Sequence, residues 1–196
     1  MRIITTVAAT LSIWALTAAA AAASADWDKC AQQDDLDGGI AACTRIINAG
    51  AEKGHNLAMA FYDRGNNYKA KGDNERAILD YNQALSIDPN YASVYNNRAV
   101  AYFNKSDYDR AIADYNKSIA IDPKHLNAYI GRGDCYLQKK DYDQAIIDLN
   151  KAIALDPKSG ISYKFRSLAY KGKGDEAHAT ADYNRAVQLD PSQADH

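Results

Sequence analysis

Residues 92–125 read ASVYNNRAVAYFNKSDYDRAIADYNKSIAIDPKH, and the chain repeats this pattern with a period of 34 residues. The prolines lie at positions 89, 123, 157 and 191, so that each of them closes one copy of the pattern. Self-similarity at a fixed period of this length is the signature of a stacked repeat array. The sequence therefore predicts a series of similar structural units rather than one irregular core.

Each copy contains two amphipathic helical patterns. In the copy quoted above, Tyr95 and Ala99 lie four residues apart in the first half, as do Ala111 and Tyr115 in the second half. Spacings of three and four residues place side chains on one face of a helix, whereas strands would show alternation. No copy shows that alternation. The fold class predicted is all-α, with two helices in each copy.

Several positions hold the same residue in every copy. The Asp that follows each first helix is suited to cap the second helix, and Gly72 and Gly174 are suited to end a first helix in the left-handed conformation. In each Asp-Pro pair we expect a capping Asp followed by Pro as the first residue of the next helix. An Arg and an Asp also recur 16 residues apart, which predicts an ion pair at every helix crossing. These columns begin with Arg64, Tyr68, Lys71, Asp73, Ala77, Asp80, Asn82, Asp88 and Pro89.

The N-terminal segment precedes the repeats and differs from them. After Arg2 no charged residue occurs until Asp26, and Ala23-Ser24-Ala25 matches the small-residue cleavage site of a secretory signal peptide. The alternative is an uncleaved membrane anchor, because about 20 apolar residues can span a bilayer. We expect cleavage after Ala25 and a periplasmic or secreted mature protein without membrane insertion.

The chain has three cysteines, Cys30, Cys43 and Cys135. In an oxidising compartment Cys30 and Cys43 are expected to form a disulfide, provided that the fold brings their Cα atoms within about 7 Å. Cys135 is expected to be a small buried side chain. No clustered Cys and His spacing suggests a metal site, and no cofactor is expected.

These residues together resemble the tetratricopeptide repeat family. The resemblance rests on the 34-residue period, the paired helices, small residues such as Gly65 and Ala77 at the crossings, aromatic columns and the closing Pro. It implies a right-handed α-solenoid of helix-turn-helix repeats whose first helices line a concave face that holds peptide segments. The expected divisions are a signal peptide at 1–25, a degenerate helical pair at 26–57, and repeats at 58–91, 92–125, 126–159 and 160–193.

On that geometry the groove is formed by first-helix side chains that vary from copy to copy. Phe103 and Leu137 have an alternative role, because they can instead pack between neighbouring repeats. The predicted peptide-binding residues are Tyr62, Asn66, Lys69, Asn96, Val100, Phe103, Asn127, Ile130, Asp134, Leu137, Lys164, Leu168 and Lys171.

One well-known form of the family holds the terminal carboxylate of cytosolic chaperones with Lys, Asn and Arg side chains. Asn66 and Asn97 match its Asn positions, but Tyr62, Asn127 and Gly131 stand where cations are required, which argues against that partner.

The remaining composition narrows the class of function. The net charge of −2 argues against a nucleic-acid partner. No nucleophile motif, phosphate loop or metalloprotease motif is present, so an enzyme could exist only as an unrecognised site around Cys135, Asp134 or a histidine. We expect a non-enzymatic adaptor that binds a peptide segment of an envelope or secretion protein. The alternative is a structural homo-oligomer assembled through the repeat ends.

Overall fold

The computed structural model describes residues 22–32 and 34–193. Those residues fold into helices joined by short turns, without a strand, and the all-α prediction is confirmed. Nearly all of the predicted signal peptide lies outside the described residues. Within them, no helix combines the length and the apolar character that crossing a membrane requires. The chain divides into two compact units, the first ending at Pro89 and the second beginning at Asn90.

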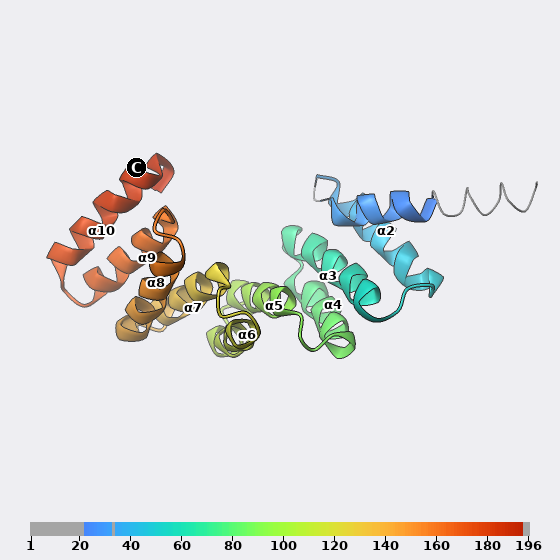
Figure 1. Ribbon diagram of the computed structural model, residues 1–196, viewed down its shortest axis with the longest axis horizontal. Coiled ribbons are helices and arrows are strands. Elements are labelled where there is room, and N and C mark those ends of the chain that lie inside the picture. The colour runs from blue at the N-terminus through green and yellow to red at the C-terminus, as the bar shows by residue number, and fades with distance from the viewer. Residues whose placement is uncertain (1–21, 33, 194–196) are drawn as a thin grey trace, which may run out of the picture. The chain divides into compact units, whose positions relative to one another are not determined.

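The first unit contains a helix at residues 22–31 followed by α2 (Leu36–Ala49), α3 (Gly54–Ala70) and α4 (Asn74–Ile87) (Figure 1). α3 packs between α2 and α4. The Sγ atoms of Cys30 and Cys43 are 2.12 Å apart, and their Cα atoms are separated by 4.8 Å, which meets the distance condition for a disulfide. Both cysteines are completely buried together with Ala42, Ile46 and Ala60.

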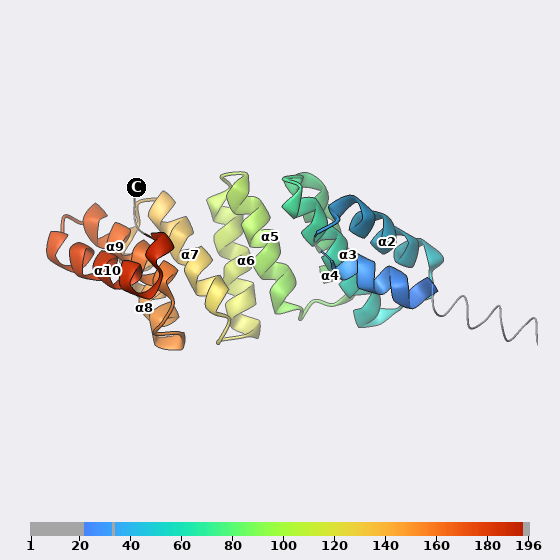
Figure 2. The same cartoon turned by 90° about the horizontal axis from the view of Figure 1, so that it is seen from above.

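In its described residues the second unit contains three pairs of antiparallel helices, and Figure 2 shows the pair α5 and α6 beside α7 of the next pair. α5 contacts α7 and α7 contacts α9, whereas within the described residues α6, α8 and α10 have no comparable contacts with one another. The first helices of the pairs are thus closer together than the second helices. This unit is a curved α-solenoid with its first helices on the inner side. The helices are α5 (Ala92–Asn104), α6 (Tyr108–Ile121), α7 (Leu126–Gln138), α8 (Tyr142–Leu155), α9 (Gly160–Gly172) and α10 (Glu176–Leu189), followed by the short 3-10 helix η1 (Pro191–Gln193).

The predicted Asp caps are confirmed at the start of every second helix. Their carboxylates accept hydrogen bonds from the backbone N–H three residues later, over 3.0 to 3.3 Å. Such a bond satisfies one of the free donors of the first turn and contributes about 1 kcal/mol. The capping residues are Asp73, Asp107, Asp141 and Asp175.

The expected role of the internal Asp-Pro pairs is wrong. Asp122 ends α6 instead of starting α7, and its carboxylate accepts a hydrogen bond from the backbone N–H of Lys124 over 2.9 Å. Pro123 therefore lies inside a turn, and α7 begins only at Leu126. An Asp side chain that bonds the backbone two residues later forms a turn of its own, and the fixed φ of Pro suits the position that this turn encloses.

The turns between paired helices all require one residue with a positive φ. Gly72 and Gly174 supply it with φ of 80°, as expected. The other two turns place Ser106 and Lys140 there, each with φ of 60°. This conformation costs a residue with a Cβ about 1–2 kcal/mol, whereas glycine adopts it without that cost.

Replacing Lys140 or Ser106 by glycine is therefore expected to stabilise the protein. The gain should be up to about 1 kcal/mol for each, since the greater flexibility of glycine in the unfolded chain offsets part of the relief. Urea unfolding of Lys140→Gly and Ser106→Gly measures it, with Gly72→Ala as the reverse control that should lose stability. A loss of stability in both glycine variants would contradict this explanation.

Candidate functional site

The first helices are fixed in place by buried Arg-Asp pairs, and the expected pair is present at every helix crossing. In each, Nε and Nη2 of the Arg donate to the two carboxylate oxygens of the Asp over 2.6 to 2.8 Å. This two-point contact fixes the rotation of a first helix against its second helix. The pairs are Arg64–Asp80, Arg98–Asp114, Arg132–Asp148 and Arg166–Asp182.

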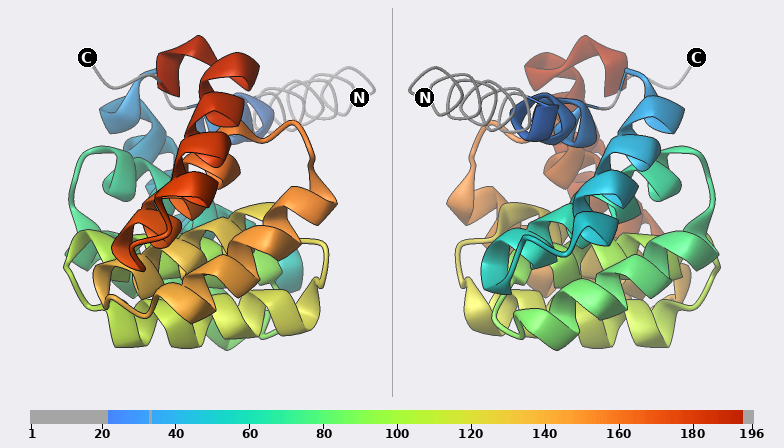
Figure 3. Two further views of the ribbon diagram at one scale, coloured as in Figure 1. Left: turned by 90° about the vertical axis from the view of Figure 1, so that its left-hand side faces the viewer. Right: turned by 90° about the vertical axis from the view of Figure 1, so that its right-hand side faces the viewer.

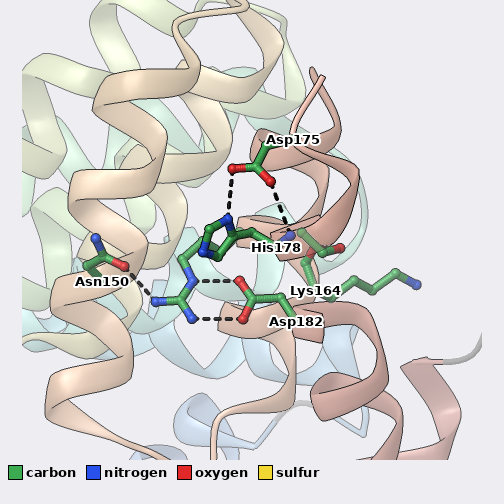
Figure 4. Close-up of polar contacts among 7 residues, drawn as sticks. Asn150, Lys164, Asp175, His178 and Asp182 are labelled. Atoms are coloured by element: carbon green, nitrogen blue, oxygen red, sulfur yellow. Dashed lines mark hydrogen bonds and ion pairs between the residues drawn. The ribbon is translucent and has the colours of Figure 1, made fainter. Parts of the chain in front are cut away.

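The remaining guanidinium nitrogen connects one repeat to the one before it. Nη1 of Arg166 donates to Oδ1 of Asn150 on α8 over 2.6 Å, and Figure 4 shows Asn150 and Asp182 on the two sides of this group. Arg132 makes the same contact with Asn116 over 2.5 Å. The Arg column thus holds the scaffold together, in agreement with its recurrence in every copy.

The predicted groove residues fall in both units of the chain. Tyr62, Asn66 and Lys69 lie on α3 in the first unit. The structure brings the others together on the inner side of the second unit, on α5, α7 and α9. We call this second set the first-helix face. It consists of Asn96, Val100, Phe103, Asn127, Ile130, Asp134, Leu137, Lys164, Leu168 and Lys171.

Two apolar members of this set serve the packing of the repeats. Phe103 packs against the core cluster around Tyr115, and its ring lies 5.4 Å from that of Tyr108 in an edge-on arrangement. Leu137 packs against the cluster that contains Leu149. The structure therefore favours the alternative stated above, that these side chains join neighbouring repeats. Their removal would damage the fold as well as any binding surface.

The predicted asparagines at two positions are also used internally. Asn66 is buried, and its Oδ1 accepts a hydrogen bond from the Tyr81 hydroxyl over 2.8 Å. Asn96 is buried as well, and its Nδ2 donates to Oδ1 of Asn97 over 3.0 Å. Neither amide is displayed to solvent, which leaves the exposed first-helix residues as the surface for contact with a partner.

The exposed and half-exposed side chains of the first-helix face are a smaller set. Leu168 is 45% exposed, which is unusual for a leucine, and Asn127 and Lys171 are exposed too. Ile130 is half-buried. Each first helix thus has a structural side, formed by buried residues that recur in every copy. Its displayed side is exposed, and the residues there vary from copy to copy.

Asp134 lies on this face with its carboxylate half-buried. Burial raises the pKa of Asp134 above its ordinary value, partly offset by a hydrogen bond from Nε2 of Gln138, over 3.0 Å. The ionised group is therefore poorly solvated, and a donor or cation from a partner would stabilise it.

A second desolvated carboxylate, on α3 in the first unit, was not found from the sequence. Burial raises the pKa of Asp63 to about 6. Asp63 falls in the same repeat position as Asn97, Gly131 and Phe165, so no recurring column pointed to it. Its environment depends on packing that the repeat pattern does not specify.

Asp63→Asn is expected to stabilise the protein at neutral pH. In the unfolded chain this carboxyl ionises near pH 4, but in the folded chain only near pH 6, so folded stability falls as the pH rises between these values. The substitution should therefore add about 1–2 kcal/mol at pH 7.5, after allowance for partial exposure, and nothing below about pH 4. Urea unfolding at pH 4 and pH 7.5 tests it, and equal effects at both pH values would contradict it.

The last helix pair of the second unit carries a pocket between α9 and α10, the pair that faces the viewer on the left of Figure 3. Its volume is about 330 Å³. In the preceding repeat, α9 covers the equivalent surface, and Leu149 there is fully buried. Tyr183 occupies the same repeat position in α10 and is half-exposed. The pocket is lined by Ser167, Leu168, Lys171, Glu176, Ala179, Thr180 and Tyr183.

The described residues offer little for chemistry. Burial raises the pKa of the Cys135 thiol to about 12, so it is a poor nucleophile at neutral pH. Nδ1 of His55 and of His178 contacts the carboxylates of Asp88 and Asp175, over 2.7 and 2.8 Å. Within the described residues, no group of His, Cys, Asp and Glu side chains is placed to hold a metal ion.

Comparison with solved structures identifies similar folds. A crystal structure of MamA is 25% identical and superposes with a TM-score of 0.72 over 83% of this chain and 92% of MamA. The first TPR domain of Spaghetti, bound to the HSP90 peptide SRMEEVD, is 22% identical, with a TM-score of 0.61 over 63% of this chain and 98% of that domain. YrrB, described as a TPR protein with an unusual peptide-binding site, is 16% identical, with a TM-score of 0.66 over 81% and 79%. Among curated proteins, none matches the sequence.

Family models give the clearest assignment. A TPR repeat model matches residues 65–106, and tetratricopeptide repeat models match residues 90–158 and 162–193. Together they cover well over half of the chain and agree with the solenoid of the second unit. The chain belongs to the tetratricopeptide repeat family of non-enzymatic protein-interaction scaffolds.

Proposed function

We propose that the protein is an exported adaptor that binds an extended or helical segment of an envelope or secretion protein on its first-helix face. The observation that carries this is the division of the first helices. Their recurring residues are used in Arg-Asp pairs and core clusters, whereas Leu168, Asn127 and Lys171 vary from copy to copy and are exposed. Peptide binding by Spaghetti and by YrrB, as their descriptions state, supports the same use of this fold.

The proposal of export is supported by the position of the expected cleavage site, among exposed residues of the helix at 22–31 and just before side chains that pack against the rest of the first unit. Ala25 and the three residues before it are exposed. Immediately afterwards, the Asp26 carboxylate accepts hydrogen bonds from Nε of Arg45 over 3.0 and 3.1 Å, and Trp27 packs against the cysteine cluster. N-terminal sequencing of the protein recovered from the envelope or medium should therefore start at Asp26. Recovery of a chain that still starts at Met1 would contradict cleavage.

The groove proposal can be tested with variants that leave the core intact. A library of random dodecapeptides displayed on phage is selected against the purified chain, and the affinities of the enriched peptides are measured by fluorescence anisotropy. Leu168→Asp and Ile130→Asp should each weaken binding by at least tenfold, since they place a charge where an apolar side chain docks. The matched control is Ile147→Asp, on α8, where the side chain is 57% exposed. Equal losses in all three variants, or enrichment of no peptide, would contradict the proposal.

A second candidate, a structural homo-oligomer assembled through the repeat ends, is favoured by the pocket between α9 and α10. A copy that inserts a helix there would cover Leu168 and Tyr183 as α9 covers the preceding repeat. Sedimentation equilibrium should then show a mass that rises with concentration and reverts to the monomer in Tyr183→Glu. A monomeric mass at all concentrations would rule this candidate out.

A further inference from the structure

Asp134 lies on α7, the middle one of the three first helices of this face, with apolar residues before and after it on that helix. On its own helix, Ile130 and Leu137 lie four residues before it and three after it, on the same side. On the neighbouring helices, the equivalent repeat positions hold Val100 and Leu168. Among the residues of this face on α5 and α7, Asp134 is thus the charged side chain, whereas on α9 the face also carries Lys164 and Lys171.

The half-buried Asp134 carboxylate differs from the buried carboxylates of the second unit. Asp114, Asp148 and Asp182 each meet an Arg within 2.7 Å. Within the described residues, the Asp134 carboxylate has no cation in contact, and its hydrogen bond is the one from Gln138. A half-buried carboxylate without a counter-ion destabilises the free protein. Its presence here is therefore not explained by a contribution to the packing of the repeats.

We infer that the first-helix face selects a peptide segment in which one Lys or Arg, flanked by apolar side chains, pairs with Asp134. This inference rests on the proposed function and specifies the partner that the site accepts. A cation supplies the missing counter-charge, while apolar flanking residues cover Val100, Ile130 and Leu168. A purely apolar segment would bury the carboxylate further without a partner, and an acidic residue at that point would be repelled.

The positive charges of the same face limit the segment to few basic residues. Lys171 is exposed in the last turn of α9, and Figure 4 shows the Lys164 side chain extending away from Asp182. The exposed Lys171 would repel a second basic residue placed over α9. The expected ligand is thus an apolar segment with a single basic residue, and not a polybasic run.

The test uses the dodecapeptides selected against the purified wild-type chain. Enriched sequences should contain one Lys or Arg between apolar residues, and Asp134→Asn should weaken their binding by at least tenfold, as expected for loss of a charge-assisted hydrogen bond. The matched control is Asp143→Asn, which removes the same charge from the exposed start of α8. It should change the affinity by less than twofold.

A charge exchange makes the test independent of any damage caused by a single substitution. Asp134→Lys should reject the selected peptides and should recover binding to versions in which their basic residue is replaced by Glu. Circular dichroism checks that each variant remains folded.

The outcomes separate this inference from the proposed function. If enriched peptides lack a basic residue, or bind Asp134→Asn as tightly as the wild type, while Leu168→Asp still abolishes binding, the groove is retained and the role of Asp134 is overturned. If no peptide is enriched, both are overturned. Single-basic apolar peptides that depend on Asp134, together with recovery in the charge exchange, would establish the inference.

Discussion

Asp148→Ala is expected to lower the free energy of unfolding by about 3–5 kcal/mol, because it breaks the ion pair with Arg132. The Asp148 side chain is only 4% exposed, and that of its partner Arg132 is 20% exposed. Removing the carboxylate leaves a buried guanidinium group without its counter-ion. The fold then has to bury that charge at full cost or open the repeat to water.

The matched control removes both charges. Arg132→Leu combined with Asp148→Ala leaves no uncompensated ion, and should lose much less stability than Asp148→Ala alone. Urea unfolding of the wild type, both single variants and the double variant gives the coupling energy. A loss of less than about 1 kcal/mol in Asp148→Ala would mean that the pair behaves like an exposed ion pair, contrary to this account.

Reduction of the Cys30–Cys43 pair is expected to produce the second largest effect, a loss of about 3 kcal/mol in the first unit. The two residues are 13 apart in sequence, and a cross-link of that span restricts the unfolded chain. A disulfide between them would join the helix at residues 22–31 to α2, and the backbone carbonyl of Cys30 also accepts a hydrogen bond from Nδ2 of Asn67 on α3, over 3.0 Å.

Trp27 offers a local reporter for this loss. It packs against the cysteine cluster, and the second tryptophan, Trp14, lies in the predicted signal peptide. Urea unfolding followed by tryptophan fluorescence, with and without dithiothreitol, should therefore show the shift in the first unit directly. Cys30→Ala with Cys43→Ala should match the reduced protein. Three free thiols in the unreduced protein, or an unchanged transition, would disprove the bond.

The sequence predicts the contacts that hold the repeats together better than it predicts the exposed residues that a partner can contact. The Arg-Asp pairs and the Asp caps could be derived because each depends on two residues at a fixed spacing within one repeat. The helix start predicted at the internal Asp-Pro pairs is wrong, because the same two residues suit a helix start and a turn equally well. Ser106 and Lys140 could not be found, since their positive φ follows from the turn geometry and not from residue type.

The sequence does not show which of the predicted groove residues are exposed, whereas the structure does. Phe103 and Leu137 have the composition of peptide anchors, but packing against neighbouring helices makes them structural. The desolvation of Asp63 and Asp134 likewise depends on the helices around them. Variation between copies identifies residues outside the recurring columns, but only the packed structure shows which of them a partner can contact.

Site-specific photo-cross-linking tests the central claim most directly, namely that the first-helix face contacts the partner while the second helices do not. The photoreactive residue p-benzoylphenylalanine replaces either Leu168 on α9 or Ile147 on α8, both exposed apolar positions of the second unit. Irradiation in cells that make the protein should yield an adduct with a distinct polypeptide from position 168 and none from position 147. Adducts from position 147 alone would contradict this account.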